Sequence, residues 1–472
     1  MRLLHKRIPM EHSFFNVLVP IKNNKYLAYN TLSLELEVIN REDYESLVNN
    51  TYSQYHPRIL DYINRGFIAP NAKEQYDEVA KGDFVNKKTG SFIHLTIMMS
   101  ESCNFSCSYC NQGQDKENLV ISGKTIEAIS QYIKKVAKPE SIVDITWFGG
   151  EPLLNIDKLL KASEELEETC IKIGATYKAR VLTNGFLLNQ ENAIKLYNNN
   201  IRTVQVSFDG DKSSHDQSRY ARKGSGTYDI ILKNISDVLN VLPLDFKLSL
   251  RVNVSKANYA RLPLLIEDLV HRNLSNKGNF VVYWGHIYDP TTSNIEDATN
   301  IDEIILDHRS FGETELEMNK MLVANNIKAS HTINESRGNC IATQKNSFVI
   351  RPNGELHKCY IPVSNRSNAC GTIFEVNNAI SSENFKKWDS WSAFEEDNCK
   401  RCKLVGSCRG GCPINYISEN FSKGEYKCPP SKLFLNEHLF ERAVNKNLVK
   451  REEWDNSCSP TKVEELKISQ LC

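Results

Sequence analysis

The sequence predicts an α/β protein built around a partial (β/α)6 TIM-like barrel, with a small α+β domain before it and a cysteine-rich segment after it. Three observations lead to this prediction. Apolar strand-like segments alternate with amphipathic helical segments between about residues 92 and 335. The first ninety residues instead pattern as short strands followed by short helices. Eight of the 14 cysteines lie between Cys340 and Cys428.

The overall composition is that of an ordinary globular protein, and 472 residues are enough for two to four domains. The 58 basic and 58 acidic side chains give no electrostatic reason to expect a nucleic acid or an anionic membrane as partner. No apolar run has the length of a membrane span or a signal peptide. We therefore expect a cytoplasmic protein, in which clustered cysteines favour metal binding over disulfides.

Residues 1–91 are predicted to form a separate domain with a winged-helix-like arrangement. The sequence Asn23-Asn24 marks a turn between two strand-like segments, and a third alternating segment follows. The expected strands are 15–21, 25–30 and 34–39, the expected short helices are 43–49 and 57–64, and 71–90 is expected to be a helix plus linker. Such a unit could be a structural cap on the next domain or a platform for a peptide partner.

Residues 92–335 are predicted to form the barrel, because six strands with intervening helices and right-handed crossovers give a curled parallel sheet. The active site of such a fold lies at the carboxyl ends of the strands. The expected strands are 92–98, 142–147, 179–182, 203–208, 247–252 and 280–284. The expected helices include 124–137, 156–173, 229–239 and 260–271.

The remaining chain divides into two parts. Residues 336–430 are rich in Cys, Gly, Asn and Pro and show little periodicity, so we expect metal rather than a large apolar core to hold them. Residues 431–472 begin with a predicted helix over 431–447 and end in a charged tail.

The most informative motif is the triplet Cys103, Cys107 and Cys110, which follows the first barrel strand in the pattern Cx3CxxC. Three thiolates at this spacing can hold three irons of a four-iron cluster and leave the fourth iron open to a ligand. A chance cluster or a structural zinc loop is the alternative, although no fourth Cys or His follows within a dozen residues.

With Tyr109 before its last cysteine, this motif resembles the signature of the radical S-adenosylmethionine (SAM) enzymes. The resemblance implies a [4Fe-4S] cluster that binds SAM and cleaves it to a 5′-deoxyadenosyl radical. It also implies an electron donor such as flavodoxin or ferredoxin. In this family the cofactor carries the radical chemistry, and the protein supplies binding and orientation.

The segment Gly149-Gly150-Glu151-Pro152 follows the second strand. Its glycines allow the backbone to approach a ligand closely, and the Glu151 carboxylate can accept a hydrogen bond from an ammonium group. Radical SAM enzymes carry this motif at the same place, and the resemblance implies that it holds the amino group of SAM.

Two further strand ends carry polar candidates. Asn184 lies in Thr183-Asn184-Gly185 after the third strand, and the family resemblance assigns Ser207, at the end of the fourth, to the ribose or carboxylate of SAM. Arg219 matches a position where related enzymes bind the SAM carboxylate, and a guanidinium suits that ligand. It could equally be a surface residue of the polar loop 213–218. Asp209 could be a turn former rather than a site residue.

Seven of the later cysteines have the spacing Cx13Gx4C, then CxxCx5Cx3C, then C. This spacing resembles the SPASM extension of radical SAM enzymes, which implies two auxiliary [4Fe-4S] clusters. The resemblance gives the nearer cluster to Cys340, Cys359 and Cys412, and the outer cluster to Cys399, Cys402, Cys408 and Cys428. A pair of zinc knuckles is the alternative for this region.

The other cysteines receive individual predictions. Cys370 could complete the nearer cluster, which we favour, or that cluster could keep an open iron for a substrate thiolate. Cys170 lies in a periodic helix and is expected in the core, while Cys458 and Cys472 are assigned no role.

Three families share this architecture: maturases of ribosomally made peptides, anaerobic sulfatase maturases and maturases of quinone cofactors. Sulfatase maturases begin their cysteine motif near the N-terminus and carry an Asp directly after the Gx4C cysteine, where this chain has Tyr360. We therefore expect a peptide maturase that binds the leader of a precursor peptide and forms a thioether or carbon–carbon cross-link. Tyr360 is the candidate catalytic residue, and it could be an acid, a base or simply a packing residue. A non-catalytic metal-bearing scaffold that binds a peptide is the alternative from another class.

Overall fold

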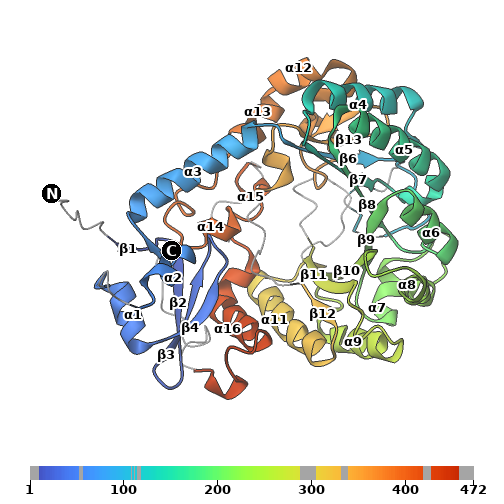
Figure 1. Ribbon diagram of the computed structural model, residues 1–472. Helices are drawn as coiled ribbons and strands as arrows, with labels where there is room; N and C mark the ends of the chain where they lie inside the picture. The colour runs from blue at the N-terminus through green and yellow to red at the C-terminus, as the bar shows by residue number, and fades with distance from the viewer. Residues whose placement is uncertain are drawn as a thin grey trace.

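The protein is described by a computed structural model that covers residues 10–52, 57–107, 109–110, 112–113, 118–287, 304–330, 339–417 and 427–455. The N-terminal domain lies on one side and the barrel on the other (Figure 1). Helix α3 (Ala72–Lys88) joins the two along one edge, and α11 (His308–Ala324) and α16 (Leu435–Asn445) lie side by side along the opposite edge.

All six predicted barrel strands are confirmed, and they run parallel in chain order through the middle of a ten-stranded sheet. Both faces of these strands are buried. On β6, Ile93, Leu95 and Ile97 share the face that packs under the outer helices, and the polar His94 and Thr96 share the other face. The strands are β6 (Phe92–Met98), β7 (Ile142–Phe148), β8 (Thr176–Thr183), β9 (Ile201–Phe208), β10 (Lys247–Val254) and β11 (Phe280–His286).

Four short strands extend this sheet beyond the prediction. β12 (Lys328–Ala329) adds next to β11, and β13 (Ser347–Ile350) adds parallel to β6 on the other side. β14 (Glu355–His357) and β15 (Gly371–Thr372) continue from β13 in antiparallel fashion. The low periodicity of residues 336–430 gave no sign of β13, β14 and β15, because strands this short leave no readable alternation in sequence.

An outer layer of helices covers the barrel (Figure 1). Buried apolar residues recur at helical spacing in α4, for example Ile126, Ile129 and Ile133, and they pack on the sheet. The expectation that Cys170 lies in the core is confirmed, because it is fully buried in α5. The helices are α4 (Gly123–Val136), α5 (Ile156–Ile173), α6 (Gln190–Asn198), α8 (Tyr228–Val241) and α9 (Leu262–His271).

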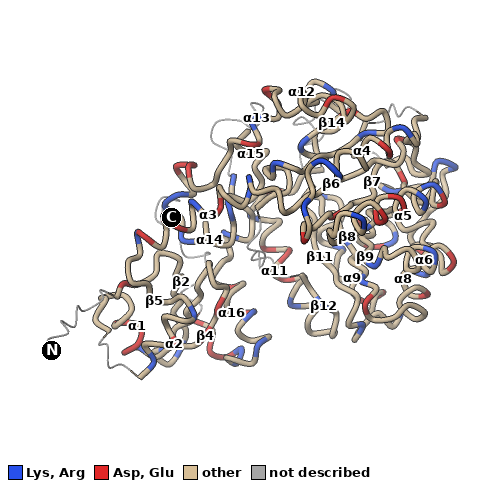
Figure 2. Tube along the Cα trace, turned by 45° about the horizontal axis from the view of Figure 1, so that its top comes forward, with Lys and Arg blue, Asp and Glu red and all other residues tan. Residues whose placement is uncertain are grey.

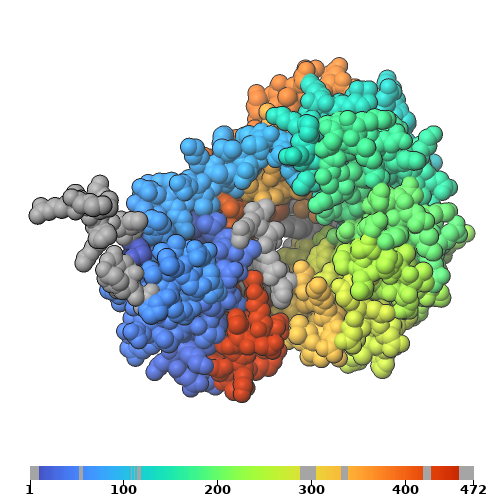
Figure 3. Space-filling model, viewed as in Figure 1, coloured from blue at the N-terminus to red at the C-terminus, as the bar shows by residue number. Residues whose placement is uncertain are grey.

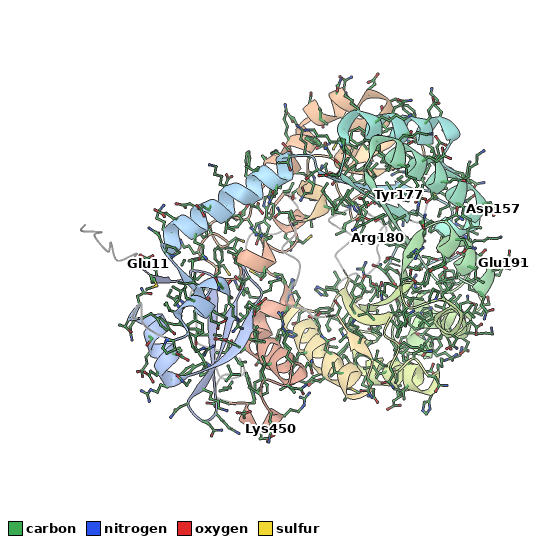
Figure 4. All side chains as sticks on the ribbon, in the orientation of Figure 1. Glu11, Asp157, Tyr177, Arg180, Glu191 and Lys450 are labelled. Atoms are coloured by element: carbon green, nitrogen blue, oxygen red, sulfur yellow. The ribbon has the colours of Figure 1, made fainter. Side chains whose placement is uncertain are left out.

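Side-chain hydrogen bonds add to this packing. The Tyr177 hydroxyl on β8 lies 2.7 Å from the Ser163 hydroxyl of α5. Figure 4 labels Tyr177 together with Asp157 and Glu191, which lie at the outer rim of the helical layer.

One local prediction about the barrel is wrong. The segment expected as a polar loop is helix α7 (Lys212–Ser218), which begins because the Asp211 carboxylate accepts the Ser213 N–H.

The N-terminal domain contains the three predicted antiparallel strands and both short helices. The strands are β2 (Asn16–Ile21), β3 (Lys25–Asn30) and β4 (Leu36–Asn40), and the helices are α1 (Arg41–Val48) and α2 (Ile59–Asn64). A second, two-stranded sheet joins β1 (Glu11–His12) to β5 (Ile68–Ala69). α1 and α2 cover one face of the three-stranded sheet, packing around Ala28 and Ile39.

Helix α16, which the sequence places in a C-terminal tail, covers the other face of this sheet. Leu439, Phe440 and Ala443 pack against Leu27 and Tyr29 of β3. The N-terminal sheet therefore completes its core with residues more than 400 positions away in sequence.

The segment expected as a helix plus linker is a docked helix. Asp83 and Lys87 of α3 are buried and form an ion pair. Asp83 also binds Arg409, and Lys87 also binds the Trp391 carbonyl, both in the cysteine-rich segment.

Lys, Arg, Asp and Glu are interspersed along the chain, as Figure 2 shows. Among the helices of the described residues, none has the length and apolar character needed to cross a bilayer.

The first prediction concerns the contact between α16 and the sheet. Leu439→Ala should lower the local unfolding free energy of the N-terminal sheet by about 2–5 kcal/mol, because a fully buried side chain is removed. Hydrogen exchange of the β3 amides measures this change. Leu448→Ala is the control, since Leu448 is 41% exposed. Equal exchange rates for the two variants would contradict the packing described.

Candidate active site

A cavity opens at the carboxyl ends of the barrel strands, where the prediction places the active site. Its walls come from the loop after β6 and from the ends of β7 through β11. Tyr360 and Ile361, which follow β14, close the cavity on one side. Viewed from the side shown in Figure 3, the molecule is hollowed between the N-terminal domain and the barrel.

The three cysteines of the first motif line this cavity. Cys103, Cys107 and Cys110 lie in the loop after β6, and Phe105 anchors the loop by inserting into the barrel core. The loop also bonds to the segment after α7, through the Ser106 N–H and the Tyr220 carbonyl. Burial raises the pKa of Cys107 to about 11, so this thiol carries a proton unless a metal or cation displaces it.

The two glycines of the second motif press against the cysteine loop. A Cβ on Gly150 would lie 1.9 Å from the Ser102 carbonyl oxygen, and one on Gly149 would lie 2.6 Å from the Met98 Cβ. Both residues also have positive φ angles, 87° and 53° for Gly149 and Gly150. The sequence predicts that the backbone approaches a ligand closely at these glycines. In the structure, the group that they approach is the backbone of the cysteine loop.

Glu151 is fully buried and already holds three donors. Its carboxylate accepts the Thr183 hydroxyl (2.7 Å), the Asn184 N–H (2.7 Å) and the Leu153 N–H (3.0 Å). It is not among the residues that line the cavity. In this arrangement its side chain ties the end of β7 to the end of β8.

Asn184 is one of the residues that Glu151 positions. Its side-chain amide donates to the Asn104 side chain at 2.7 Å and lies 3.9 Å from the Cys103 sulfur. The third strand end is thereby held against the cysteine loop.

Tyr109, Arg219, Asp209 and Asn253 form one hydrogen-bonded group. The Tyr109 hydroxyl donates to Asp209 and accepts from Arg219 and Asn253, each at 3.1 Å. Arg219 is 7% exposed, so the alternative that it is a surface residue is wrong. Its Nε is buried and has no hydrogen-bond partner among the described residues. Asp209 is 2% exposed and is a site residue, not a turn former alone.

Several lining residues were missed in the sequence. Gln205 precedes Ser207 by two positions on β9, and Arg251 precedes Asn253 by two on β10, and all four face the cavity. Successive side chains on a strand alternate between faces, so polar residues two apart in an apolar strand are the signal that identifies this inner face.

Tyr360 lies in the cavity wall opposite the cysteine loop. Its ring centre is 5.7 Å from that of Phe148, at the end of β7. Burial raises the pKa of its hydroxyl, and Arg251 nearby lowers it in part. At neutral pH the hydroxyl is therefore protonated and can serve as a donor.

The seven later cysteines gather in the two groups that the spacing predicted. Cys340, Cys359 and Cys412 are electrostatic neighbours of one another. Cys399, Cys402, Cys408 and Cys428 line one small pocket together with Tyr416 and Lys432. Burial raises the pKa of Cys340 to about 11 and of Cys408 to about 12.

Cys370 does not join the group of three. Its thiol is buried in the barrel core, where Lys358 and Ser382 are its electrostatic and hydrogen-bond neighbours and none of the three thiols is among them. This geometry counts against our preference for Cys370 as a cluster ligand. Cys458 and Cys472 lie outside the described residues.

Comparison with known proteins agrees with this site. Residues 97–246 match the radical SAM superfamily. Over 92% of both chains it is 25% identical to the radical SAM cyclopropyl synthase TigE of Paramaledivibacter caminithermalis. It is 22% identical to the serine-type anaerobic sulfatase-maturating enzyme of Klebsiella aerogenes, over 75% of this chain and 88% of that enzyme.

Two solved structures share the fold at low sequence identity. One is anSMEcpe with bound AdoMet and the Kp18Cys peptide, with a TM-score of 0.57 at 17% identity over 75% of this chain and 98% of that one. The other is Streptococcus suis SuiB bound to the precursor peptide SuiA, with a TM-score of 0.52 at 16% identity over 89% and 99%.

The second prediction tests the contact between the glycines and the cysteine loop. Gly150→Ala should displace the loop backbone and remove about four irons per chain after anaerobic reconstitution, because the loop can no longer present its three thiols together. Iron and acid-labile sulfide analysis measures the change. Gly123→Ala is the matched control, since a Cβ there meets no atom within 4 Å. Full iron content in Gly150→Ala would refute the idea that this glycine supports the cysteine loop.

Proposed function

We propose that this protein is a radical SAM/SPASM peptide maturase, which abstracts hydrogen from a ribosomally made precursor peptide and forms a thioether or carbon–carbon bond. The observation that carries the proposal is the meeting of Cys103, Cys107 and Cys110 with Asn184, Ser207 and Arg219 around one cavity. The likeness to a cyclopropyl synthase along 92% of the chain puts carbon–carbon bond formation first.

The donor set fits the proposed cofactors. The three loop thiols would hold a [4Fe-4S] cluster with one open iron, and the buried Arg219, whose Nε has no partner in the described structure, suits the carboxylate of SAM. When bound, SAM and this cluster would supply a 5′-deoxyadenosyl radical that takes hydrogen from the substrate. The chain's own residues exclude water, orient SAM and hold the cysteine loop.

The two later thiol groups would hold auxiliary [4Fe-4S] clusters, which would supply an electron acceptor. Within the described residues, no three His, Cys, Asp or Glu side chains form a site for a single metal ion. The radical SAM motif that precedes these two thiol groups favours clusters over zinc knuckles, as the SPASM resemblance implies. With Cys370 elsewhere, an open iron in the nearer cluster becomes the better alternative.

We assign residues 1–91 the role of a leader-binding domain, 92–335 the radical SAM core, 336–430 the SPASM domain and 431–472 the C-terminal helix and tail. The edges of the β2–β3–β4 sheet support the proposed role as a peptide platform, because among the described residues β2 and β4 each pair with β3 alone. An extended peptide can add to such an edge through main-chain hydrogen bonds. A flavodoxin or ferredoxin would deliver the reducing electron.

Sulfatase maturation is the second candidate, because several relatives carry that name. Tyr360, in the position expected for an Asp, counts against it. A non-catalytic scaffold is disfavoured by the burial of Arg219 and the polar residues around it, which a mere peptide-binding surface does not need.

The third prediction is the metal content of the whole chain. Anaerobically reconstituted protein should contain about twelve irons and as many sulfides, falling to about eight irons when Cys103, Cys107 and Cys110 are all changed to Ala. Zinc in place of iron would overturn the enzyme proposal. About four irons with zinc in the C-terminal groups would overturn the auxiliary clusters alone.

The fourth prediction concerns the substrate. Co-expression with the small open reading frames beside its gene should yield a peptide about 2 Da lighter, because either cross-link removes two hydrogen atoms, one of them to 5′-deoxyadenosine. Tandem mass spectrometry locates the bond, and the triple-cysteine variant is the control. A product that reacts with a hydrazide as an aldehyde would instead indicate formylglycine formation.

A further inference from the structure

Asp209 is a buried carboxylate at the end of β9 on which three elements converge. Its oxygens accept the Tyr109 hydroxyl of the cysteine loop at 2.6 and 2.5 Å, and the Ser218 hydroxyl of α7 at 2.7 Å. They also accept the Asn253 side-chain amide of β10 at 3.1 Å. Its main-chain N–H bonds to the His215 ring at 3.2 Å. This one side chain therefore joins the cysteine loop to two other parts of the barrel.

The carboxylate determines which way the Tyr109 hydroxyl points. A phenol has a single hydrogen, and an ionised carboxylate can only accept, so this hydrogen is directed at Asp209. The oxygen lone pairs of Tyr109 are then left to accept from Arg219 Nη1 and Asn253 Nδ2, both at 3.1 Å. Arginine can only donate, so the bond to Arg219 depends on this orientation.

Arg219 is held by the phenol instead of by a carboxylate. Its Nη1 bonds to Tyr109, its guanidinium lies 5.9 Å from the centre of the Phe105 ring, and its Nε has no partner among the described residues. The guanidinium lines the cavity and is 7% exposed. A direct pair with Asp209 would occupy the fork that a ligand needs, whereas the phenol between them fixes Arg219 and leaves that fork available.

We propose that Asp209 is a positioning residue, which acts through the Tyr109 hydroxyl to fix the Arg219 guanidinium for the carboxylate of SAM. The inference rests on the proposed function, because it takes SAM as the ligand of this cavity. Asp209 would then belong to the site although it lies behind the residues that contact the ligand.

The test is the affinity of anaerobically reconstituted full-length protein for SAM and for decarboxylated SAM, which lacks only the carboxylate. Asp209→Asn should weaken SAM binding by about tenfold or more, with unchanged iron content, because a hydrogen bond that orients a charged group is lost. Decarboxylated SAM should bind the variant and the wild type alike. Equilibrium dialysis gives both dissociation constants.

Tyr109→Phe provides a second, smaller change. It should weaken SAM binding by a similar factor, and the double variant should be no weaker than either single variant, because both act on the same hydrogen bond. Asp211→Asn is the matched control with unchanged affinity. Asp211 is also buried, but its carboxylate binds Arg261 and the start of α7, and it does not line the cavity.

Unchanged SAM affinity in both Asp209→Asn and Tyr109→Phe would overturn the inference. So would an equal loss of affinity for SAM and decarboxylated SAM, since that result indicates general damage to the site. A wild-type protein that contains its irons and binds neither ligand would overturn the proposed function itself, which separates the two failures.

Discussion

Buried hydrogen bonds between the cysteine loop and the strand ends are the constraint on which the site depends. Within its described residues, the loop after β6 has one large apolar anchor, Phe105, and no helix or strand around its three thiols. Glu151 and Asp209 fix the positions that apolar packing leaves unsupported, because each carboxylate accepts hydrogen bonds from at least three donors inside the barrel. Such bonds are strong in a low-dielectric interior, and leaving a partner unpaired there is costly.

The path of the chain brings the two residues that follow Cys359 to the same cavity. β13 adds to the free side of β6, which places Tyr360 opposite Phe148 and next to Cys359. A buried ion pair between Arg351 and Glu101 fastens this addition to the cysteine loop at 2.5 Å. α3 and α16 then close the arrangement, since they pack the N-terminal domain against the cysteine-rich segment and against α11 respectively.

Much of this could be read from the sequence, and the failures have physical reasons. The barrel strands were predictable because each is an apolar run between amphipathic helices, and the thiol groups because the cysteine spacing resembles that of the SPASM extension. Strands as short as β13, and the packing of α16 on β3, were not predictable, because they depend on partners far away in sequence. Glu151 and Arg219 could be singled out, but the donors that surround each one only appear in three dimensions.

The central claim is that the cavity beside the cysteine loop holds SAM on the open iron of a cluster. The most direct measurement is electron–nuclear double resonance on the reduced, reconstituted protein with SAM labelled with ¹⁷O in its carboxylate. The account predicts ¹⁷O hyperfine coupling to the cluster in the wild type and none in Cys107→Ala. A reduced cluster bound by Cys103, Cys107 and Cys110 that shows no coupling at saturating SAM would contradict it.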